Sequence, residues 1–326
     1  MKKILSIILI ALAAVSCSKK DDSPEPKKQT DVYAIITEYS PIEQSYIWKN
    51  GTKTLLGKGK ANRLFVSNND VYVIGKETQN GKDIIKFWKN GSPSMLTDGQ
   101  KDAYATGIYV LGNDVYISGF ESKSGVYLAK CWKNGVATVL NSDETKTGQA
   151  NSVFVSGTDV YVTGYENNGI RKIAKYWKNG TAVTLSDGNY NEGGNSIFVS
   201  GNDVYVAGFR LDNGKYIAKM WKNGIATELT EAGAVSSWTS CIGVCNGKVY
   251  IAGRVGEYAT LWENNIPINL GNNRSVYDMS IKDGDIYLSG VNSEGEKYKA
   301  AMWKNEIETL LTDGATPCDA NGIFVK

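Results

Sequence analysis

The chain has 326 residues, with 36 Lys and Arg against 34 Asp and Glu, a formal net charge of +2, and no His. Without His, the sequence lacks the usual general base of a catalytic triad and the commonest neutral metal ligand. Lys2 and Lys3 account for the whole excess charge, so the rest of the chain is formally neutral. A neutral chain does not support nucleic-acid binding, which needs a basic stripe.

Residues 1–16 have the pattern of a secretory signal peptide. Two lysines precede an apolar run, Ile4 to Val15, that is too short to span a bilayer by itself. The tetrapeptide Ala-Val-Ser-Cys that ends at Cys17 resembles the bacterial lipobox. This resemblance implies that Cys17 is acylated and becomes the mature N-terminus. An ordinary secretion signal with a chance cysteine is the alternative.

Residues 17–30 are polar, lack aromatic residues and contain two prolines, which is typical of a flexible tether. Ser18, directly after the cysteine, fits release to the outer membrane in the familiar lipoprotein sorting rule. The following Lys-Lys-Asp-Asp is similar to short charged signals that place lipoproteins on the cell surface. We therefore expect a lipid-anchored outer-membrane protein, periplasmic or surface-exposed, and favour the surface. A plain solvated tether would have the same composition.

One unit recurs along the chain at intervals of 40–45 residues. Each unit contains a tryptophan downstream of a Val-Tyr or Ile-Tyr pair, and five of these tryptophans precede Lys-Asn-Gly. The tryptophans are Trp48, Trp88, Trp132, Trp177, Trp221, Trp262 and Trp303. Seven phased copies indicate a repeat architecture.

Each unit has the pattern of four short strands. In the most regular unit we expect strands at 196–200, 203–207, 216–221 and 225–229. Gly-Asn joins the first two and Asn-Gly the last two, and these dipeptides tolerate the positive φ of two-residue hairpin turns. Four antiparallel strands per unit, repeated seven times, predict an all-β protein, a seven-bladed β-propeller.

The two ends of the repeat region complement each other. The first unit begins with its second strand, at 31–33, and the chain ends with a first strand, at 320–326. We expect this C-terminal strand to pair with the N-terminal one, complete blade 1 and close the ring, which removes exposed strand edges. Residues 31–326 are thus predicted to form a single, monomeric propeller domain.

The repeats Val-Ser-Gly-Asn-Asp-Val-Tyr-Val-Ala-Gly (199–208) and Lys-Met-Trp-Lys-Asn-Gly (219–224) resemble those of a group of bacterial propeller lipoproteins. The resemblance covers essentially all of the mature chain. It implies the propeller fold and an envelope location, and it brings no assigned activity or site. The units lack the Gly-His and Trp-Asp marks of WD repeats and the paired glycines of kelch repeats.

Residues present in every blade are best explained by packing between blades. Function is therefore to be sought where the repeat departs from its own pattern. In a four-stranded blade the two hairpin turns lie on one face, and the second-to-third and blade-to-blade loops lie on the other. The turns of this chain are uniform and the other loops vary, so we expect this variable face to bind ligands.

Blades 6 and 7 depart most from the pattern. The middle of the first strand is aromatic in five blades, but blade 6 has Gly243 and blade 7 has Ser280. Losing two neighbouring aromatic rings predicts open space beside the axis or between blades, unless Cys241, Cys245 and local repacking fill it. Trp238, the only tryptophan outside the repeat, is expected in the long loop that leads into blade 6.

Two groups of residues are predicted to bind a ligand. Arg254 and Arg274 are expected in shortened loops near Trp238, and together these residues mark a candidate ligand sector. A ring of polar residues is expected where the first strands enter the ring: Asn62, Thr106, Asn151, Asn195, Ser240 and Asn321, with Tyr277 in blade 7. The ring could line a channel mouth and bond a sugar or peptide. In the alternative, the asparagines satisfy loop backbone.

No metal site or cofactor is predicted. Asp-Gly pairs after three fourth strands fit turns, because no loop has the alternating Asp and Asn of a calcium site. Cys241 and Cys245, four apart on one strand, would lie about 13 Å apart, too far for a disulfide or a shared metal. The sequence leaves open whether Cys131, Cys241, Cys245 and Cys318 form any disulfide, because the compartment is oxidising.

Two functions remain possible from the sequence. The first is a tethered binding or interaction propeller that presents its variable face to a glycan, a peptide or an envelope partner. The second is a carbohydrate-active enzyme resembling a glycoside hydrolase, which needs two carboxylates about 5–10 Å apart. Glu121, Glu166, Glu192 and Glu257 are candidates, but nothing in the sequence pairs them, so no catalytic residue is assigned. Propellers host both roles, and we favour the first.

Overall fold

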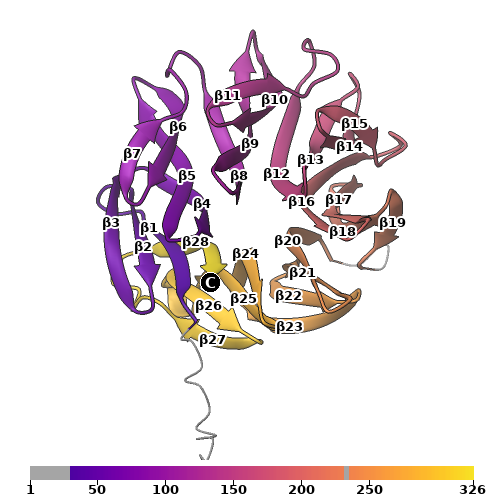
Figure 1. Ribbon diagram of the computed structural model, residues 1–326. Helices are drawn as coiled ribbons and strands as arrows, with labels where there is room; N and C mark the ends of the chain where they lie inside the picture. Colours follow the sequence, from indigo (N-terminus) through magenta and orange to yellow (C-terminus); the bar gives the residue numbers. More distant parts are fainter. Residues whose placement is uncertain (1–29, 231–234) are drawn as a thin grey trace, which may run out of the picture. The chain divides into compact units, whose positions relative to one another are not determined.

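A computed structural model describes residues 30–230 and 235–326. The predicted signal peptide, the acylated Cys17 and the tether before Thr30 lie outside the described residues. Within the described residues, 28 strands form seven four-stranded antiparallel sheets arranged as blades around an axis (Figure 1). The helical content there is one short 3-10 turn, η1 (Glu294–Glu296). The all-β, seven-bladed prediction is therefore confirmed.

The strands of each blade are given from the axis outward. Blade 1 comprises β28 (Cys318–Val325), β1 (Val32–Glu38), β2 (Gln44–Lys49) and β3 (Thr52–Lys58), and blade 2 comprises β4 (Lys60–Ser67), β5 (Asp70–Gln79), β6 (Lys82–Lys89) and β7 (Ser92–Met95). Blade 3 comprises β8 (Ala103–Leu111), β9 (Asp114–Lys123), β10 (Val126–Lys133) and β11 (Val136–Val139), and blade 4 comprises β12 (Gly148–Ser156), β13 (Asp159–Asn167), β14 (Lys172–Lys178) and β15 (Thr181–Thr184).

The remaining blades follow the same order. Blade 5 comprises β16 (Asn191–Ser200), β17 (Asp203–Asp212), β18 (Lys215–Lys222) and β19 (Ile225–Glu228). Blade 6 comprises β20 (Ser237–Cys245), β21 (Lys248–Val255), β22 (Tyr258–Glu263) and β23 (Ile266–Asn272), and blade 7 comprises β24 (Arg274–Lys282), β25 (Asp285–Asn292), β26 (Lys299–Lys304) and β27 (Ile307–Leu310).

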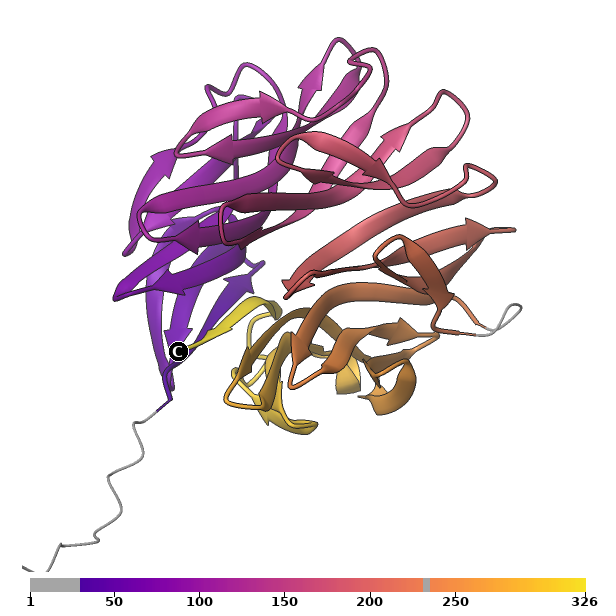
Figure 2. The ribbon, with the colours of Figure 1, turned by 45° about the vertical axis from the view of Figure 1, so that its right-hand side comes forward.

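The ring is closed by the C-terminal strand, as predicted. β28 pairs antiparallel with β1, with Tyr33 opposite Phe324. Asp31 and Lys326 exchange backbone hydrogen bonds of 3.1 and 2.9 Å at the outer end of this ladder. The yellow C-terminal strand accordingly lies beside the indigo N-terminal strands in both views (Figures 1 and 2). Blade 1 is thus assembled from the two ends of the chain.

The repeated Asp-Val-Tyr and Trp-Lys-Asn-Gly sequences meet at the hairpin turns of blades 1–5. In blade 5, the Asn223 side chain accepts a hydrogen bond from the Val204 N–H at 2.8 Å and donates one to the Asp203 carboxylate at 2.7 Å. Lys222 pairs with the same carboxylate at 2.8 Å and lies over the Tyr205 ring. Positive φ at Asn223 and Gly224 gives the turn the mirror-image form that matches strand twist. These repeated residues therefore fasten the turns.

The hydrophobic core lies between neighbouring blades. One cluster, for example, joins Tyr205 and Met220 of blade 5 to Ile242, Ile251 and Trp262 of blade 6. The repeat tryptophans other than the half-buried Trp48 are buried: Trp88, Trp132, Trp177, Trp221, Trp262 and Trp303. Each blade therefore depends on its neighbours for burial of its apolar surface.

Candidate functional site

Each inner strand carries one β-bulge, at the level of the predicted polar ring. The register shifts by one residue between Ala61 and Arg63 in blade 2, and the corresponding shift occurs in the other blades. The bulged residues are Asn62, Thr106, Asn151, Asn195, Ser240, Tyr277 and Asn321. A bulge re-aims the side chain of the extra residue. All seven residues line one cavity of about 340 Å³ on the propeller axis, here called the axial mouth.

Side chains of the axial mouth tie neighbouring blades together. Four of them donate to the backbone carbonyl just before the bulge of the next blade, at 2.7–3.1 Å. The four donors are Asn62, Thr106, Asn151 and Asn195. The amide nitrogens thus donate to strand backbone of the next blade. This role is close to the alternative given above, in which the asparagines satisfy loop backbone. The Oδ1 atoms of these asparagines accept no hydrogen bond from the described part of the chain. Asn321 differs, because it donates to Thr37 Oγ1 at 3.1 Å.

Arg63 bridges the sector in which this ring of bonds is interrupted. Its Nη1 donates to the carbonyls of Asn62 at 2.9 Å and Asn321 at 3.0 Å, and its Nη2 donates to the carbonyl of Tyr277 at 3.3 Å. Its Nε lies 3.9 Å from the Asp278 carboxylate. One guanidinium therefore connects blades 2, 1 and 7. This sector contains blade 1, in which β28 and β1 come from opposite ends of the chain.

Sequence reasoning missed Arg63, although one signal could have found it. Arg63 directly follows its bulge, and the same position elsewhere holds Gly107, Ser152, Ser196, Cys241, Asp278 and Gly322. The one cation and the one anion of this ring face each other across Gly322. Burial raises the pKa of Asp278, and the Arg63 charge opposes that rise. The Asp278 carboxylate also accepts the Ile323 N–H at 3.2 Å.

Below the mouth, the axis holds a second cavity of about 480 Å³. Its wall is an arc of aromatic rings with neighbouring centroids 4.7–5.0 Å apart: Phe324, Phe65, Tyr109, Phe154 and Phe198. The arc is open at Gly243 and Ser280. A methyl group on Gly243 would lie 2.8 Å from Ile281 Cδ1 and 3.1 Å from Met279 Sδ. Ile281 and Met279 of blade 7 thus lie beside the gap, and Cys241 and Cys245 line the same cavity.

A third cavity, of about 460 Å³, is lined mainly by blades 6 and 7, with Tyr216 from blade 5, and is here called the blade 6 cavity. Its lining residues are Tyr216, Ser236, Ser237, Trp238, Ser240, Arg254, Gly256, Ser275, Val276 and Tyr277. Trp238, Ser240 and Tyr277 also line the axial mouth. The two cavities are therefore contiguous. Three predicted site residues from different strands, Trp238, Arg254 and Tyr277, are brought together here.

Trp238 lies on a strand and not in the expected loop, because β20 already begins at Ser237, before its bulge. It pairs in register with Arg254 of β21, so Arg254 is not in a loop either. The Trp238 ring stacks on Phe209 with centroids 4.8 Å apart and meets the edge of Tyr216 at 5.0 Å. It remains 36% exposed. Two blade 5 rings therefore hold an accessible indole in place.

The two predicted arginines have different environments. Arg254 is exposed, and its Nε donates to the Gly256 carbonyl at 2.5 Å. Arg274, the first residue of β24, makes two hydrogen bonds of 3.0 Å to Glu308. The hydrogen bonds that Arg274 donates to the Glu308 carboxylate raise the pKa of Arg274 despite partial burial. Arg274 lines neither cavity and is used within blade 7, so the structure does not bring it to the candidate site.

Three of the candidate carboxylates are occupied by lysines. Glu121 pairs with Lys130 at 2.5 Å, Glu192 pairs with Lys219, and Glu166 is buried in blade 4. Glu257 is exposed in the β21–β22 turn.

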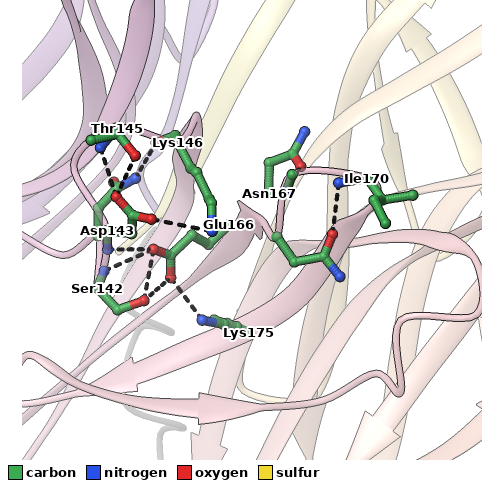
Figure 3. Close-up of polar contacts among 11 residues, drawn as sticks. Ser142, Asp143, Thr145, Lys146, Glu166, Asn167, Ile170 and Lys175 are labelled. Atoms are coloured by element: carbon green, nitrogen blue, oxygen red, sulfur yellow. Dashed lines mark hydrogen bonds and ion pairs between the residues drawn. The ribbon is translucent and has the colours of Figure 1, made fainter.

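Glu166 is surrounded by donors (Figure 3). It accepts the Ser142 N–H and hydroxyl at 2.8 Å, the Asp143 N–H at 3.0 Å and Lys175 at 2.7 Å. Burial alone would raise the pKa of Glu166, but the hydrogen bonds from Lys175, Ser142 and the Asp143 N–H hold it below its ordinary value. An acid catalyst near neutral pH needs a raised pKa. This environment suits a structural clamp.

The structure also answers the cysteine question that the sequence leaves open. The described cysteines have free thiols: Cys131, Cys241, Cys245 and Cys318. Burial raises the pKa of Cys131 to about 12, so this thiol is inert near neutral pH. Within residues 30–230 and 235–326, no three His, Cys, Asp or Glu side chains are grouped to hold a metal ion. The same residues include no helix long and apolar enough to cross a membrane.

No protein-family model and no curated protein matches the chain. Its fold is similar to the β-propeller domain of the trilobed protease from Pyrococcus furiosus, with a TM-score of 0.56 and 11% identity over 90% of this chain and 95% of that one. It is also similar to an acylaminoacyl peptidase from Pyrococcus horikoshii, with a TM-score of 0.55 and 11% identity over 89% of this chain and 52% of that one. The comparison with TolB from Acinetobacter baumannii has a TM-score of 0.49 and 12% identity, over 73% of this chain and 63% of that one.

The chain thus spans about half of the peptidase and less than two thirds of TolB. At such identities the likeness shows the fold alone. Fold and cavities together define a seven-bladed β-propeller with a polar axial mouth on its variable face. Membership of the lipoprotein group that the repeats resemble stays a prediction.

Proposed function

We propose that the protein is a binding propeller that holds a glycan on its variable face, in the axial mouth and the blade 6 cavity. The observation that carries the proposal is the continuity of these two cavities through Trp238, Ser240 and Tyr277. Their combined space is in the range of ligand sites, which are concave, partly aromatic and equipped with a few polar groups.

The polar groups of the two cavities fit a ligand rich in hydroxyl groups. The asparagine Oδ1 atoms of the mouth have no donor among the described residues, and serines contribute hydroxyls that both donate and accept. The exposed ring of Trp238 offers an apolar platform for the flat face of a sugar. A peptide or an envelope protein, the other partners predicted from the sequence, would make less use of a ring of acceptors.

Replacing the platform tests this proposal. We expect Trp238→Ala to weaken glycan binding about tenfold or more, equivalent to about 1.4 kcal/mol, because the variant removes the exposed apolar surface of the cavity. The measurement is a glycan array of residues 30–326, followed by calorimetry of the hits. Tyr104→Ala is the matched control, since Tyr104 precedes its bulge by two residues as Trp238 does, but lines neither cavity. Equal affinities of wild type and Trp238→Ala would contradict the proposal, and binding only to peptides or proteins would redirect it.

We further propose that the propeller is anchored in the outer membrane by acylation of Cys17, with the domain at the cell surface. The support is the lipobox-like tetrapeptide and the Ser18-containing tether. Metabolic labelling with a palmitate analogue should modify the wild-type chain and not Cys17→Ser, which loses the acylated thiol. External protease should shave the protein from intact cells. Labelling of the variant would exclude the lipid anchor, and protection from protease would place the domain in the periplasm.

The alternative of a glycoside hydrolase has no specific observation in its favour. Glu121, Glu166 and Glu192 each hold a lysine, and none of them lines the axial mouth or the blade 6 cavity. A hydrolase panel run beside the array would reveal turnover, and turnover lost in a single Glu variant would replace the binding function by an enzymatic one.

A further inference from the structure

Of the described residues that line the blade 6 cavity, one is charged. That charge is the guanidinium of Arg254, which is accompanied by four serines and three aromatic residues. No carboxylate lines the cavity among the residues that the structure describes. A cavity with an uncompensated cation and many hydroxyls favours an anion whose remaining surface is polar.

Arg254 breaks a pattern that holds around the ring. Its position on the second strand holds Thr37, Lys76, Phe120, Tyr165, Phe209 and Val291 in the other blades. Lys76, the other cation, is neutralised by Asp83 at 2.7 Å. Arg254 has no carboxylate within salt-bridge distance among the residues that the structure describes. Its charge is therefore the one in this series that remains for a ligand.

The geometry of Arg254 is suited to recognise a carboxylate. Its Nε is held by the Gly256 carbonyl, and its two terminal nitrogens make no hydrogen bond to the described chain. Those terminal nitrogens form the planar fork that binds carboxylates in a bidentate manner. The charge also reaches the cavity wall, because it opposes the rise that burial causes in the pKa of Tyr277.

Trp238 and Arg254 are direct cross-strand partners, so both side chains can contact the same unit of a ligand. Side chains so placed start about 4.5–5.5 Å apart on one face of the sheet. A sugar ring lying on the indole would bring a substituent carboxylate within reach of the guanidinium. Further sugars would extend past Ser240 toward the acceptor oxygens of the axial mouth.

We propose that the ligand is an acidic saccharide, in which a uronic acid ring lies on Trp238 and its carboxylate accepts two hydrogen bonds from the terminal nitrogens of Arg254. This inference rests on the proposed glycan-binding function and specifies its substrate class. Arg254 supplies the selection for charge, and Trp238 and the axial mouth supply contacts that any saccharide could use.

Calorimetry with paired oligosaccharides tests the inference. The probes are oligomers of galacturonate, glucuronate and mannuronate, each paired with the same oligomer after its carboxyl groups have been reduced to alcohols. We expect the best acidic oligomer to bind at least thirtyfold more tightly than its reduced partner. Arg254→Gln should remove that ratio and leave the affinity for the reduced oligomer unchanged. Arg254→Lys should restore part of it, because lysine keeps the charge but lacks the fork.

The outcomes separate this inference from the function on which it rests. If a neutral oligomer binds as tightly as its acidic partner, and Trp238→Ala weakens both, the protein binds glycans and the acidic class is wrong. If no oligosaccharide binds, both proposals are wrong. If glutamate-rich peptides show the same dependence on Arg254, the site recognises carboxylates without a sugar and the saccharide assignment is overturned. Unchanged melting temperatures confirm that the variants are folded.

Discussion

Deletion of Cys318–Lys326 is expected to prevent the chain from folding into a closed ring. The deletion removes the inner strand of blade 1, in which Ile323 and Val325 are buried, and uncovers Ile35 and Ile36, which are fully buried against it. Each buried aliphatic side chain contributes about 1.5–3 kcal/mol. With the backbone ladder of β1 and β28 also lost, the total approaches the whole stability of about 5–15 kcal/mol of a typical protein. Urea unfolding followed by circular dichroism should therefore show no cooperative transition.

A point variant and a peptide sharpen this test. Ile323→Asp places a charge in the same interface and should destabilise strongly, whereas Ile307→Asp, on the exposed outer strand of blade 7, should change stability by less than about 1 kcal/mol. A peptide of residues 316–326, added in excess to the truncated chain, should restore the transition in a concentration-dependent way. A truncated chain with an unchanged unfolding midpoint would show that the C-terminal strand does not close the ring.

Glu166→Ala is expected to cost about 3–5 kcal/mol at pH 7, the usual cost of leaving one partner of a buried ion pair alone. Its side chain is 4% exposed and that of Lys175 is 15% exposed. The substitution also leaves the Ser142 and Asp143 N–H groups without their acceptor, so the loop between blades 3 and 4 loses its attachment (Figure 3). Urea unfolding midpoints of the two proteins measure the difference.

Glu121→Ala is the matched control in blade 3. Glu121 pairs with Lys130 and lies near Lys101, but it accepts no loop N–H among the described residues, so we expect a smaller cost of about 1 kcal/mol. If Glu121→Ala were as harmful as Glu166→Ala, the loop attachment would not be the cause.

The effect of Glu166 should depend on pH in one direction. Its folded pKa is lower than its ordinary value of 4.5, so the unfolded state binds the proton more readily. The stabilisation is then complete above pH 4.5 and is lost as the pH falls through the folded pKa. The gap between wild type and Glu166→Ala should accordingly narrow in acid. A constant gap from pH 7 to strongly acidic pH would exclude the ionised carboxylate as its source.

Much of the fold was predictable because the repeated unit has a nearly constant length. The spacing of tryptophans such as Trp177 and Trp221 counts the blades, and Asn223 and Gly224 mark a turn whose positive φ other residues resist. The unmatched strands at the two ends predicted the closure. These are local or periodic properties, and seven repetitions average out the noise of any one copy.

The candidate site was predictable in part. The polar ring was found because polar residues occupy the same position of the first strand in six of the seven repeats, with Tyr277 in the seventh. Trp238 was found because it stands outside the repeat. Arg63 was missed because its role depends on carbonyls of Asn321 and Tyr277, which come from two other blades. Arg274 was assigned to the site because it is close in sequence to blade 6. The sequence could not show that its guanidinium is bound by Glu308, which lies on another strand of blade 7.

The sequence by itself therefore determined the blade count, the strand order, the turns and the closing strand, since each depends on residues close together or on a repeated interval. Only the tertiary structure decided the bulges that aim seven side chains at the axis, the contiguity of the axial mouth with the blade 6 cavity, and which arginine stays available. The physical reason is that these features are contacts between blades, where residues such as Arg63 and Tyr277, far apart in the chain, approach within hydrogen-bonding distance only after the ring has closed.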